Sequence, residues 1–529
     1  MEFKFGGSET NQRTVLGHPS GLFVLFFTEM WERFSYYGMR ALLVLFLVST
    51  VLDGGWAWDR ADALVLYGWY TGLVYITPII GGFIADKFMG YRNAVILGAF
   101  IMTMGHASMA LEGMTSMFFY AGLTFLIIGN GLFKPNISSM VGQLYKTQGK
   151  EKDAGYTIFY MGINAGAFLG ILLCGYIGEN IGWHYGFGLA GVFMFFGMLQ
   201  FYFAQKIFGK IGLTPKQLKD FDDVIEDSFE EIEDNIEDTI EEAESSVVVR
   251  DRLIVIGIFS LFVIFFWWAF EQAGGSMTIF AADYTDRALE GDAALTFKII
   301  NSIITVVPML VITWVLMLLF KQTYGKYSLS NIFLGISFVI IWGIVLWMLN
   351  REFQQDATEV PASWFSVLNS LFIILFAPLF SKIWQSKYNP SGPMKFAIGL
   401  FLVGLGFAAL AYGASGIPEG AKTASVSMIF LVIAYYLHTM GELCVSPVGL
   451  SYVSKLAPVK LVGLMFGVWF TANFFANLLG GFTGSFIDPI SEEYGLSTFF
   501  LIFTVIPMAA AVIMMLLNPM MKRKMHGIE

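Results

Sequence analysis

The sequence predicts an all-α membrane protein with two bundles of spanning helices joined by a cytoplasmic linker. Three observations predict this fold class: the composition, the series of long apolar segments, and the distribution of Lys and Arg. Of the 529 residues, 56% are hydrophobic and only 14% are charged. Soluble domains contain about 25% charged residues, and a soluble chain of this length could not bury so much apolar surface. The composition therefore places the chain in a lipid bilayer.

Fourteen segments are candidate membrane spans, each of which needs about 20 mostly apolar residues. Six precede a polar stretch, at 20–50, 62–86, 93–111, 117–145, 154–178 and 185–207. Eight follow it, at 251–281, 295–320, 328–350, 362–381, 394–413, 424–454, 461–484 and 497–519. The polar stretch itself, residues 208–250, divides the chain into two halves.

The basic residues predict the orientation, because cytoplasmic loops are enriched in Lys and Arg. With the N-terminus inside, twenty-three of the thirty-one bases fall in cytoplasmic segments. The outer segments hold five, which are Arg60, Arg287, Lys298, Arg351 and Lys422. This asymmetry predicts that both termini are cytoplasmic. Arg33, Arg40 and Lys134 remain, and all three lie within spans.

The polar stretch accounts for the acidity of the chain. Residues 220–244 contain fourteen of the forty-one acids and no base, so the rest of the chain carries 27 acids against 31 bases. Phe221, Ile225, Phe229, Ile232, Ile236 and Ile240 recur every three or four residues. That spacing predicts an amphipathic helix, which we interpret as an acidic linker helix. A regulatory docking segment is the alternative.

Six spans, a cytoplasmic linker and a second bundle resemble the two-halved major facilitator architecture, in which substrate binds near the midplane between the halves. Residues 81–92 (GGFIADKFMGYR), in the loop after the second span, resemble the loop motif of that class. Eight spans after the linker leave one extra hairpin. We expect an N-terminal six-helix bundle at 1–207, the linker at 208–250, the first helix of the second bundle at 251–282, the extra hairpin at 283–350, and five further helices at 351–529.

Ionisable groups inside spans are costly and usually mark function. Glu29, Glu32, Arg33, Tyr36, Tyr37 and Arg40 recur at helical spacing and form one stripe along the first span. Glu271 and Glu442 lie within later spans. Two carboxylates and an Arg on adjoining turns can exchange partners when a proton arrives, which is the chemistry of a proton-coupled carrier. Structural ion pairing is the alternative interpretation of any single charge.

Residues 28–40 (TEMWERFSYYGMR) resemble the first-helix signature of the proton-dependent oligopeptide transporter family. Further matches follow in the order of the family's helices: 131–136 (GLFKPN), 159–166 (FYMGINAG), Trp267 with Glu271, and 441–447 (GELCVSP). Together these motifs touch nearly every functional helix of the family. The resemblance implies a proton-driven symporter of di- and tripeptides.

The resemblance also implies roles for individual residues. Arg40 and Lys134 would hold the substrate carboxylate, while Asn164, Glu442 and Ser446 would receive its ammonium group. Glu29, Glu32, Arg33 and Glu271 would couple transport to protons. Tyr36, Tyr37, Tyr75, Tyr160, Trp267 and Trp469 would line the cavity. Two ion pairs between the halves are implied, Arg40 with Glu271 and Lys134 with Glu442.

Several of these residues have a structural alternative. Tyr75 and Tyr160 would then be interface packing, Trp469 an aromatic at the membrane interface, and Asn164 a bridge between helices. His438 lies four residues before Glu442 and is either a spectator or a proton relay.

Two departures from the family pattern change the expectations. Gly68 stands where animal members carry a proton-handling His, so coupling would rest on the carboxylates. The extra hairpin falls after the seventh family helix, whereas residues 361–371 (PASWFSVLNSL) match the eighth. We expect the hairpin at the periphery, with no direct role in transport.

Two rival functions remain open: a proton-coupled carrier of another small solute such as nitrate, and a membrane peptide sensor. An enzyme is not expected, because the sequence has no nucleophile constellation, metal cluster or phosphate loop. No cofactor, nucleotide or nucleic acid is expected, and Cys174 and Cys444 are interpreted as packed thiols. No cleavable signal is expected at the N-terminus. The expected protein is a multi-pass transporter of the cell membrane that acts as a monomer, with peptides, protons and lipid as its partners.

Overall fold

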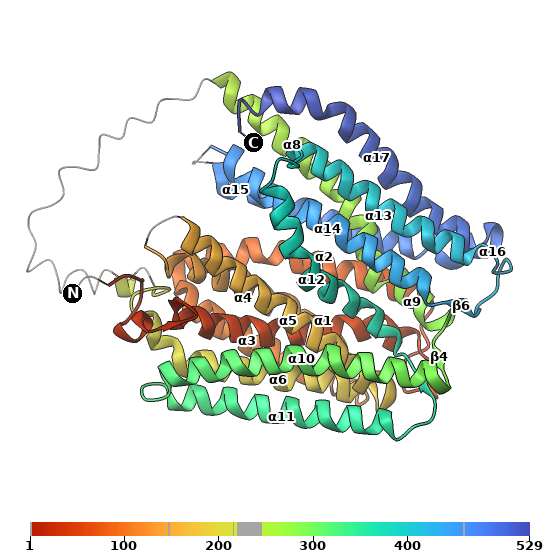
Figure 1. Cartoon of the computed structure of the whole chain (residues 1–529), viewed down its shortest axis with the longest axis horizontal. Coiled ribbons are helices and arrows are strands. Elements are labelled where there is room, and N and C mark those ends of the chain that lie inside the picture. Colours follow the sequence, from red (N-terminus) through yellow and green to blue (C-terminus); the bar gives the residue numbers. More distant parts are fainter. Residues whose placement is uncertain (1–2, 147–148, 215, 219–245, 459–460, 529) are drawn as a thin grey trace, which may run out of the picture.

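The computed structural model describes residues 3–146, 149–214, 216–218, 246–458 and 461–528. The helix predicted from the spacing between Phe221 and Ile240 lies outside these residues. Within them the chain is almost entirely helical, and Figure 1 shows long helices running side by side in two groups.

The first group contains six helices in chain order. They are α1 (Ser20–Val48), α2 (Arg60–Ile84), α3 (Gly90–Met109), α4 (Ser116–Gln143), α5 (Lys150–Asn180) and α6 (Trp183–Ala204). Three short turns accompany them: η1 (Glu9–Gln12), the π-helical η2 (Ala85–Met89) and η3 (Gln205–Phe208). We call this group the N-bundle.

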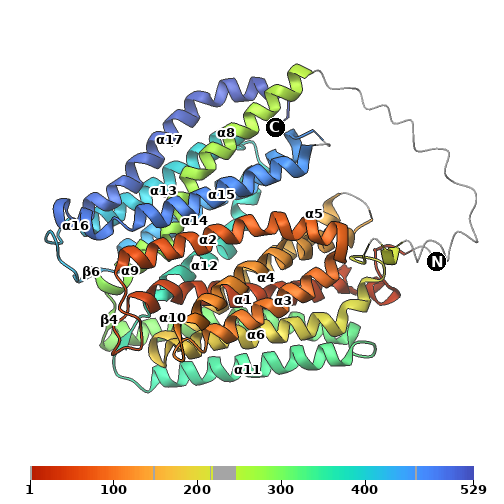
Figure 2. The ribbon, with the colours of Figure 1, turned by 180° about the vertical axis from the view of Figure 1, so that it is seen from behind.

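The second group, the C-bundle, is formed by helices from the later part of the chain and is seen from behind in Figure 2. Its helices are α8 (Ser246–Phe270), η4 (Glu271–Gly274), α9 (Ser276–Asp283), η5 (Ala362–Ser366), α12 (Val367–Trp384), α13 (Gly392–Ala414), α14 (Ile429–Leu456), α15 (Val462–Gly484), α16 (Ile487–Tyr494) and α17 (Leu496–Lys524).

Three two-stranded ribbons join loops. β1 (Thr14–Val15) pairs with β2 (His18–Pro19) ahead of α1. β3 (Thr285–Asp286) pairs in parallel with β6 (Val426–Ser427), and β4 (Ala288–Leu289) pairs antiparallel with β5 (Thr358–Glu359). The β4–β5 ribbon therefore flanks the hairpin that follows α9, and the β3–β6 ribbon joins the loop after α9 to the loop before α14.

The extra hairpin consists of α10 (Gly291–Thr323) and α11 (Ser328–Phe353). It follows the first helix of the C-bundle in sequence, but it packs on the N-bundle, against α6 and α1, with α11 outermost (Figures 1 and 2). The Phe338 ring lies 5.6 Å from the Trp31 ring and 5.7 Å from the Phe27 ring. Ser330 Oγ donates to the Gln200 carbonyl at 2.8 Å.

Twelve stretches of the described chain are long and apolar enough to cross a membrane. One of them, Arg60–Met109, contains both α2 and α3. The helix α1 is not among the twelve, because it carries Glu29, Glu32, Arg33 and Arg40. Helices of this number and length make the chain a multi-pass membrane protein.

The charged stripe of α1 is fixed in place by α5. A Cβ atom at Gly166 would lie 2.1 Å from the Met30 carbonyl oxygen, and one at Gly170 would lie 2.2 Å from the Phe34 carbonyl oxygen. Small residues at helix contacts allow backbones to approach closely in membrane proteins. The glycines therefore bring α5 directly against the turns of α1 that carry Glu32, Arg33 and Tyr37.

Candidate functional site

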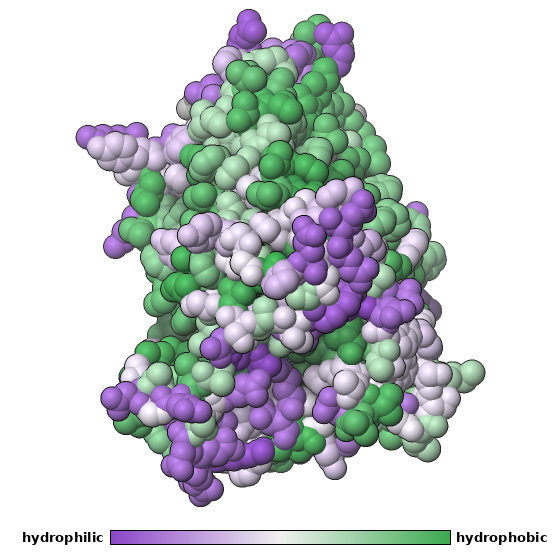
Figure 3. All heavy atoms as spheres, turned by 90° about the vertical axis from the view of Figure 1, so that its right-hand side faces the viewer, coloured by the Kyte–Doolittle hydropathy of each residue, from purple (hydrophilic) through white to green (hydrophobic). Residues whose placement is uncertain are grey.

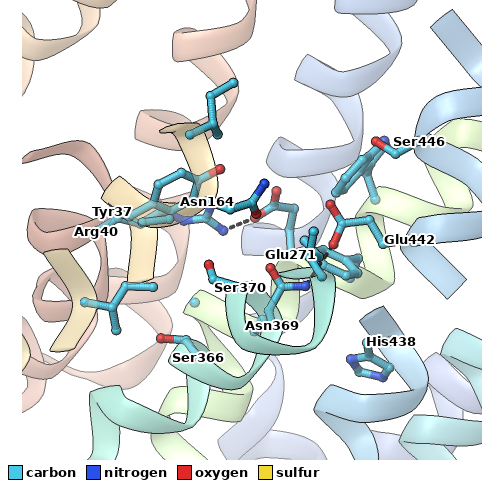
Figure 4. Close-up of a pocket in the computed structure, with 18 of the residues that line it drawn as sticks. Tyr37, Arg40, Asn164, Glu271, Ser366, Asn369, Ser370, His438, Glu442 and Ser446 are labelled. Atoms are coloured by element: carbon cyan, nitrogen blue, oxygen red, sulfur yellow. Dashed lines mark hydrogen bonds and ion pairs between the residues drawn. The ribbon is translucent and has the colours of Figure 1, made fainter. Parts of the chain in front are cut away.

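A cavity of about 300 Å³ lies between the two bundles. The N-bundle contributes polar, ionisable and aromatic side chains to its wall: Tyr37, Arg40, Tyr75, Lys134, Tyr160 and Asn164. The C-bundle contributes Trp267, Phe270, Glu271, Ser366, Asn369, Ser370, Tyr435, His438, Glu442, Ser446, Trp469 and Asn473. Figure 4 shows that Arg40 and Glu271 point toward one another across this space. The cavity therefore places cations on one bundle opposite carboxylates on the other.

Arg40 and Glu271 form an ion pair between α1 and η4. The Arg40 Nε also donates to the Tyr67 hydroxyl at 2.7 Å. Glu271 stands at the point where α8 changes from α-helix to the 3-10 turn η4, and its side chain is buried. This is the first of the two pairs implied by the sequence resemblance.

The second implied pair is absent from the described residues in this conformation. Lys134 lies with its Nζ 4.7 Å from the centre of the Tyr75 ring. The Glu442 carboxylate instead accepts a hydrogen bond from Asn369 Nδ2 at 2.8 Å, and the same Nδ2 lies 3.1 Å from Thr439 Oγ1. Lys134 and Glu442 both line the cavity, so each contacts the space that a substrate could occupy.

Glu29, Glu32 and Arg33 form a buried cluster behind the cavity wall. Arg33 Nε lies 2.9 Å from Glu29 Oε1 and 2.5 Å from Glu32 Oε2. Asn130 Nδ2 of α4 donates to Glu32 Oε1 at 3.2 Å. The three charged residues are at most 3% exposed, and none of them lines the cavity. Neighbouring carboxylates that share one Arg can change partners when one of them takes a proton.

Most of the residues expected at the cavity are found there, but Tyr36 is not. Tyr37, Tyr75, Tyr160, Asn164, Trp267, Ser446 and Trp469 all line it. The Tyr36 ring instead packs at 5.0 Å from the Tyr37 ring and at 6.4 Å from the Tyr70 ring, under the Arg33 guanidinium. Tyr36 therefore lies outside the cavity wall in this conformation. Neighbouring residues on a helix diverge by about 100°, and of the two tyrosines it is Tyr37 that lines the cavity.

His438 reaches the edge of the cavity but packs as an aromatic side chain. Its ring lies 4.6 Å from the Phe407 ring, and a Cβ atom at Gly406 would meet its Nε2 at 2.6 Å. In Figure 4 the imidazole points away from Glu442.

One end of the cavity is closed by contacts between the bundles. Arg60 of α2 lies 2.5 Å from Asp283 and 2.9 Å from Asp488. Glu179 of α5 accepts from the backbone nitrogens of Ala362 and Ser363 at 2.7 and 3.0 Å. Figure 3 views this end, where hydrophilic side chains gather over the loops and are bordered by hydrophobic helix surfaces.

Three partners of the charged residues were not expected from the sequence. The Tyr67 hydroxyl accepts from Arg40, Asn130 donates to Glu32, and Asn369, which lines the cavity, donates to Glu442. The sequence does contain a pattern that could have identified Asn369: Ser366, Asn369 and Ser370 form a polar i, i+3, i+4 face in an otherwise apolar span. Among the described residues, His, Cys, Asp and Glu side chains do not gather into a cluster that could hold a metal ion.

Comparison with known proteins shows which family shares this architecture. A family model described as the POT family matches residues 92–226 and 335–502. A Bacillus subtilis protein, the uncharacterised transporter YclF, is 32% identical, covering 98% of this chain and 97% of that protein. The peptide transporter YePEPT of Yersinia enterocolitica is 31% identical over the same shares.

A solved structure gives the same result for the fold. The crystal structure of a peptide transporter POT in complex with sulfate superposes with a TM-score of 0.74 at 29% identity, covering 97% of both chains. The family is one of transporters, and both halves of the present chain take part in the match. The chain belongs to the POT family.

Proposed function

We propose that this protein is a proton-coupled symporter that imports di- and tripeptides by alternating access of the cavity. The observation that carries the proposal is the placement of Arg40 and Lys134 opposite Glu271 and Glu442 around a space of about 300 Å³. A short peptide is a zwitterion, and it needs a cation at one end and a carboxylate at the other. The relatives of this chain include di- and tripeptide transporters of Lactococcus lactis, which supports the same substrate.

In this proposal, Lys134 and Arg40 receive the substrate carboxylate, to which charged groups donate strong hydrogen bonds. Glu442, Asn164 and Ser446 receive the ammonium group. Tyr37, Tyr75, Tyr160, Trp267 and Trp469 form the walls against which the peptide side chains pack. The supporting observation is that all ten of these residues line one cavity.

Coupling is assigned to Glu29, Glu32, Arg33 and Glu271. A proton arriving at one carboxylate releases Arg33 to the other, and a proton at Glu271 releases Arg40 from the pair that joins the bundles. Proton and substrate then compete for the same ionic partners, and they shift the equilibrium only because their affinities differ between the two states.

The topology in this proposal has fourteen spans, with both termini in the cytoplasm. The N-bundle covers 1–207, the linker 208–250, the first C-bundle helix 251–282, the hairpin 283–350 and the remaining helices 351–529. The distribution of Lys and Arg supports the orientation, and the helix bounds agree with the span bounds to within a few residues. A cavity lined by one chain supports function as a monomer in the plasma membrane.

Substrate-dependent proton flux into liposomes tests the function. Dialanine added outside should acidify the lumen of proteoliposomes that contain a pH-sensitive dye, whereas nitrate should not. A pure sensor would give no flux with either solute, and a nitrate carrier would respond to nitrate alone. Either result would reject the proposal.

A further inference from the structure

Asn130 is a buried polar residue that contacts the proton-coupling cluster but has no role in the scheme above. It lies in α4, is 0% exposed, and donates through Nδ2 to Glu32 Oε1 at 3.2 Å. Its own Oδ1 has no hydrogen-bond partner among the described residues. A buried acceptor without a partner is costly. The amide therefore contacts Glu32 through Nδ2 and leaves Oδ1 available for a further hydrogen bond.

The position of Asn130 is fixed by its neighbours in the chain. A Cβ atom at Gly129 would lie 2.7 Å from the Gly98 carbonyl oxygen of α3, and one at Gly131 would lie 2.7 Å from Thr77 Cβ of α2. The backbone of α4 is therefore clamped between α2 and α3 at this turn. The Asn130 side chain consequently has little freedom to move away from Glu32.

A primary amide can serve both forms of a carboxyl group. Its N–H donates to an ionised carboxylate, and its oxygen accepts from the O–H of a protonated carboxylic acid, after rotation of the amide plane. Arg33 offers donors only, so it serves the ionised form alone. Asn130 already contacts Glu32 through its amide, and its unpartnered Oδ1 can accept the hydrogen bond that a protonated Glu32 donates.

We propose that Asn130 is a positioning residue for proton coupling, which holds the Glu32 carboxyl group in both of its protonation states. The inference rests on the proposed function of Glu32. The titratable and charged groups that surround Glu32 are Glu29 and Arg33 on α1, Lys134 on α4 and Tyr70 on α2. Substitution of Asn130 leaves all four in place, so the amide can be tested separately.

The test is the pH profile of dialanine uptake by proteoliposomes, measured for the full-length chain with Asn130→Leu and Asn130→Asp. Hydrogen bonds to charged groups are stronger than those to neutral groups. Loss of the amide therefore destabilises the ionised form of Glu32 more than the protonated form, so Glu32 takes up its proton at a higher pH. The midpoint of the profile should rise by about one pH unit in Asn130→Leu. It should rise further in Asn130→Asp, which places a second acid beside Glu32.

Counterflow of labelled dialanine at equal pH on both sides separates coupling from folding. Both variants should retain counterflow within about threefold of the parent while proton-driven uptake falls about tenfold. Asn477→Leu is the matched control, since Asn477 is also a buried helical Asn with an unpartnered Oδ1 but lies in α15, outside the cavity wall. Its pH midpoint should not move.

Unchanged midpoints in both Asn130 variants would overturn the inference, as would equal loss of uptake and counterflow in both, which is the mark of a purely structural residue. If the parent protein itself shows neither uptake nor counterflow of dialanine, the proposed function fails instead.

Discussion

Arg40 of α1 and Glu271 of η4 form an ion pair that joins the N-bundle to the C-bundle inside the cavity. Both side chains line the cavity, and the guanidinium is also held by the Tyr67 hydroxyl. Removal of one member of a buried pair typically costs about 3–5 kcal/mol because it leaves an uncompensated charge. Any motion that separates the bundles at this level must break the pair.

We expect Glu271→Gln to reduce proton-driven dialanine uptake at least tenfold. The neutral amide leaves Arg40 unpaired whether or not a proton is available, so protonation no longer changes the link between the bundles. Uptake into proteoliposomes under an imposed pH gradient measures the effect. Glu352→Gln is the control, since Glu352 is a buried carboxylate of the extra hairpin. Full concentrative uptake by Glu271→Gln would contradict the assigned role.

Glu442 is expected to recognise the ammonium group of the substrate. A hydrogen bond to a charged group contributes about 1.5–3 kcal/mol, so N-acetylation of dialanine should weaken its binding about 10–100-fold. In Glu442→Gln, dialanine binding should fall by a similar factor while binding of the acetylated peptide changes less than about threefold. Competition against labelled dialanine measures both affinities. An equal loss for the two ligands would place Glu442 away from the ammonium group.

Phe338 of α11 anchors the extra hairpin against Trp31 and Phe27. Phe338→Ala should lower the free energy of unfolding by on the order of 2 kcal/mol, below the ~3–5 kcal/mol of soluble cores, because lipid is itself apolar. Dialanine affinity should stay unchanged, since the cavity lies elsewhere. Thermal unfolding in detergent measures the loss. Val339→Ala is the control, because Val339 is 74% exposed on the adjacent face. Equal effects of the two substitutions would contradict the packing described.

His18, just ahead of α1, should make the N-terminal segment sensitive to pH. Burial lowers the pKa of His18, an effect that Glu151 opposes and Lys4 reinforces. Its Nδ1 lies 2.7 Å from the Tyr145 hydroxyl. A His with a lowered pKa binds fewer protons when the N-terminal segment packs against Tyr145 than when that segment is free. This packing should therefore weaken as the pH falls below about 6.5.

Tryptic cleavage after the exposed Arg13 provides the measurement for this effect. The cleavage rate, corrected for the protease's own pH dependence on a peptide, should rise between pH 7.5 and 5.5. It should be independent of pH in His18→Gln. A parent protein whose corrected rate does not change over this range would refute the prediction.

The helices and the charged stripe of α1 could be predicted because they depend on local sequence. Apolar length sets each span, and the i, i+4 spacing of Glu29 and Arg33 brings them within 2.9 Å. The Arg40–Glu271 pair joins residues far apart in the chain, and it came from family resemblance rather than from spacing.

The remaining features depend on packing between distant segments. Asn369 reaches Glu442 across 73 positions, and Asn130 reaches Glu32 across 98. Tyr36 turns to Tyr70 because α2 packs there. The hairpin follows a C-bundle helix but packs on the N-bundle, and Lys134 does not pair with Glu442 in this conformation, although both line the same cavity.

The most direct test of the central claim is accumulation of radiolabelled dialanine in proteoliposomes with an alkaline interior. We predict that dialanine reaches a higher concentration inside than outside, and that a protonophore or Glu32→Gln abolishes this accumulation. Dialanine that only equilibrates across the membrane, or that accumulates equally in the presence of the protonophore, would contradict proton-coupled peptide import.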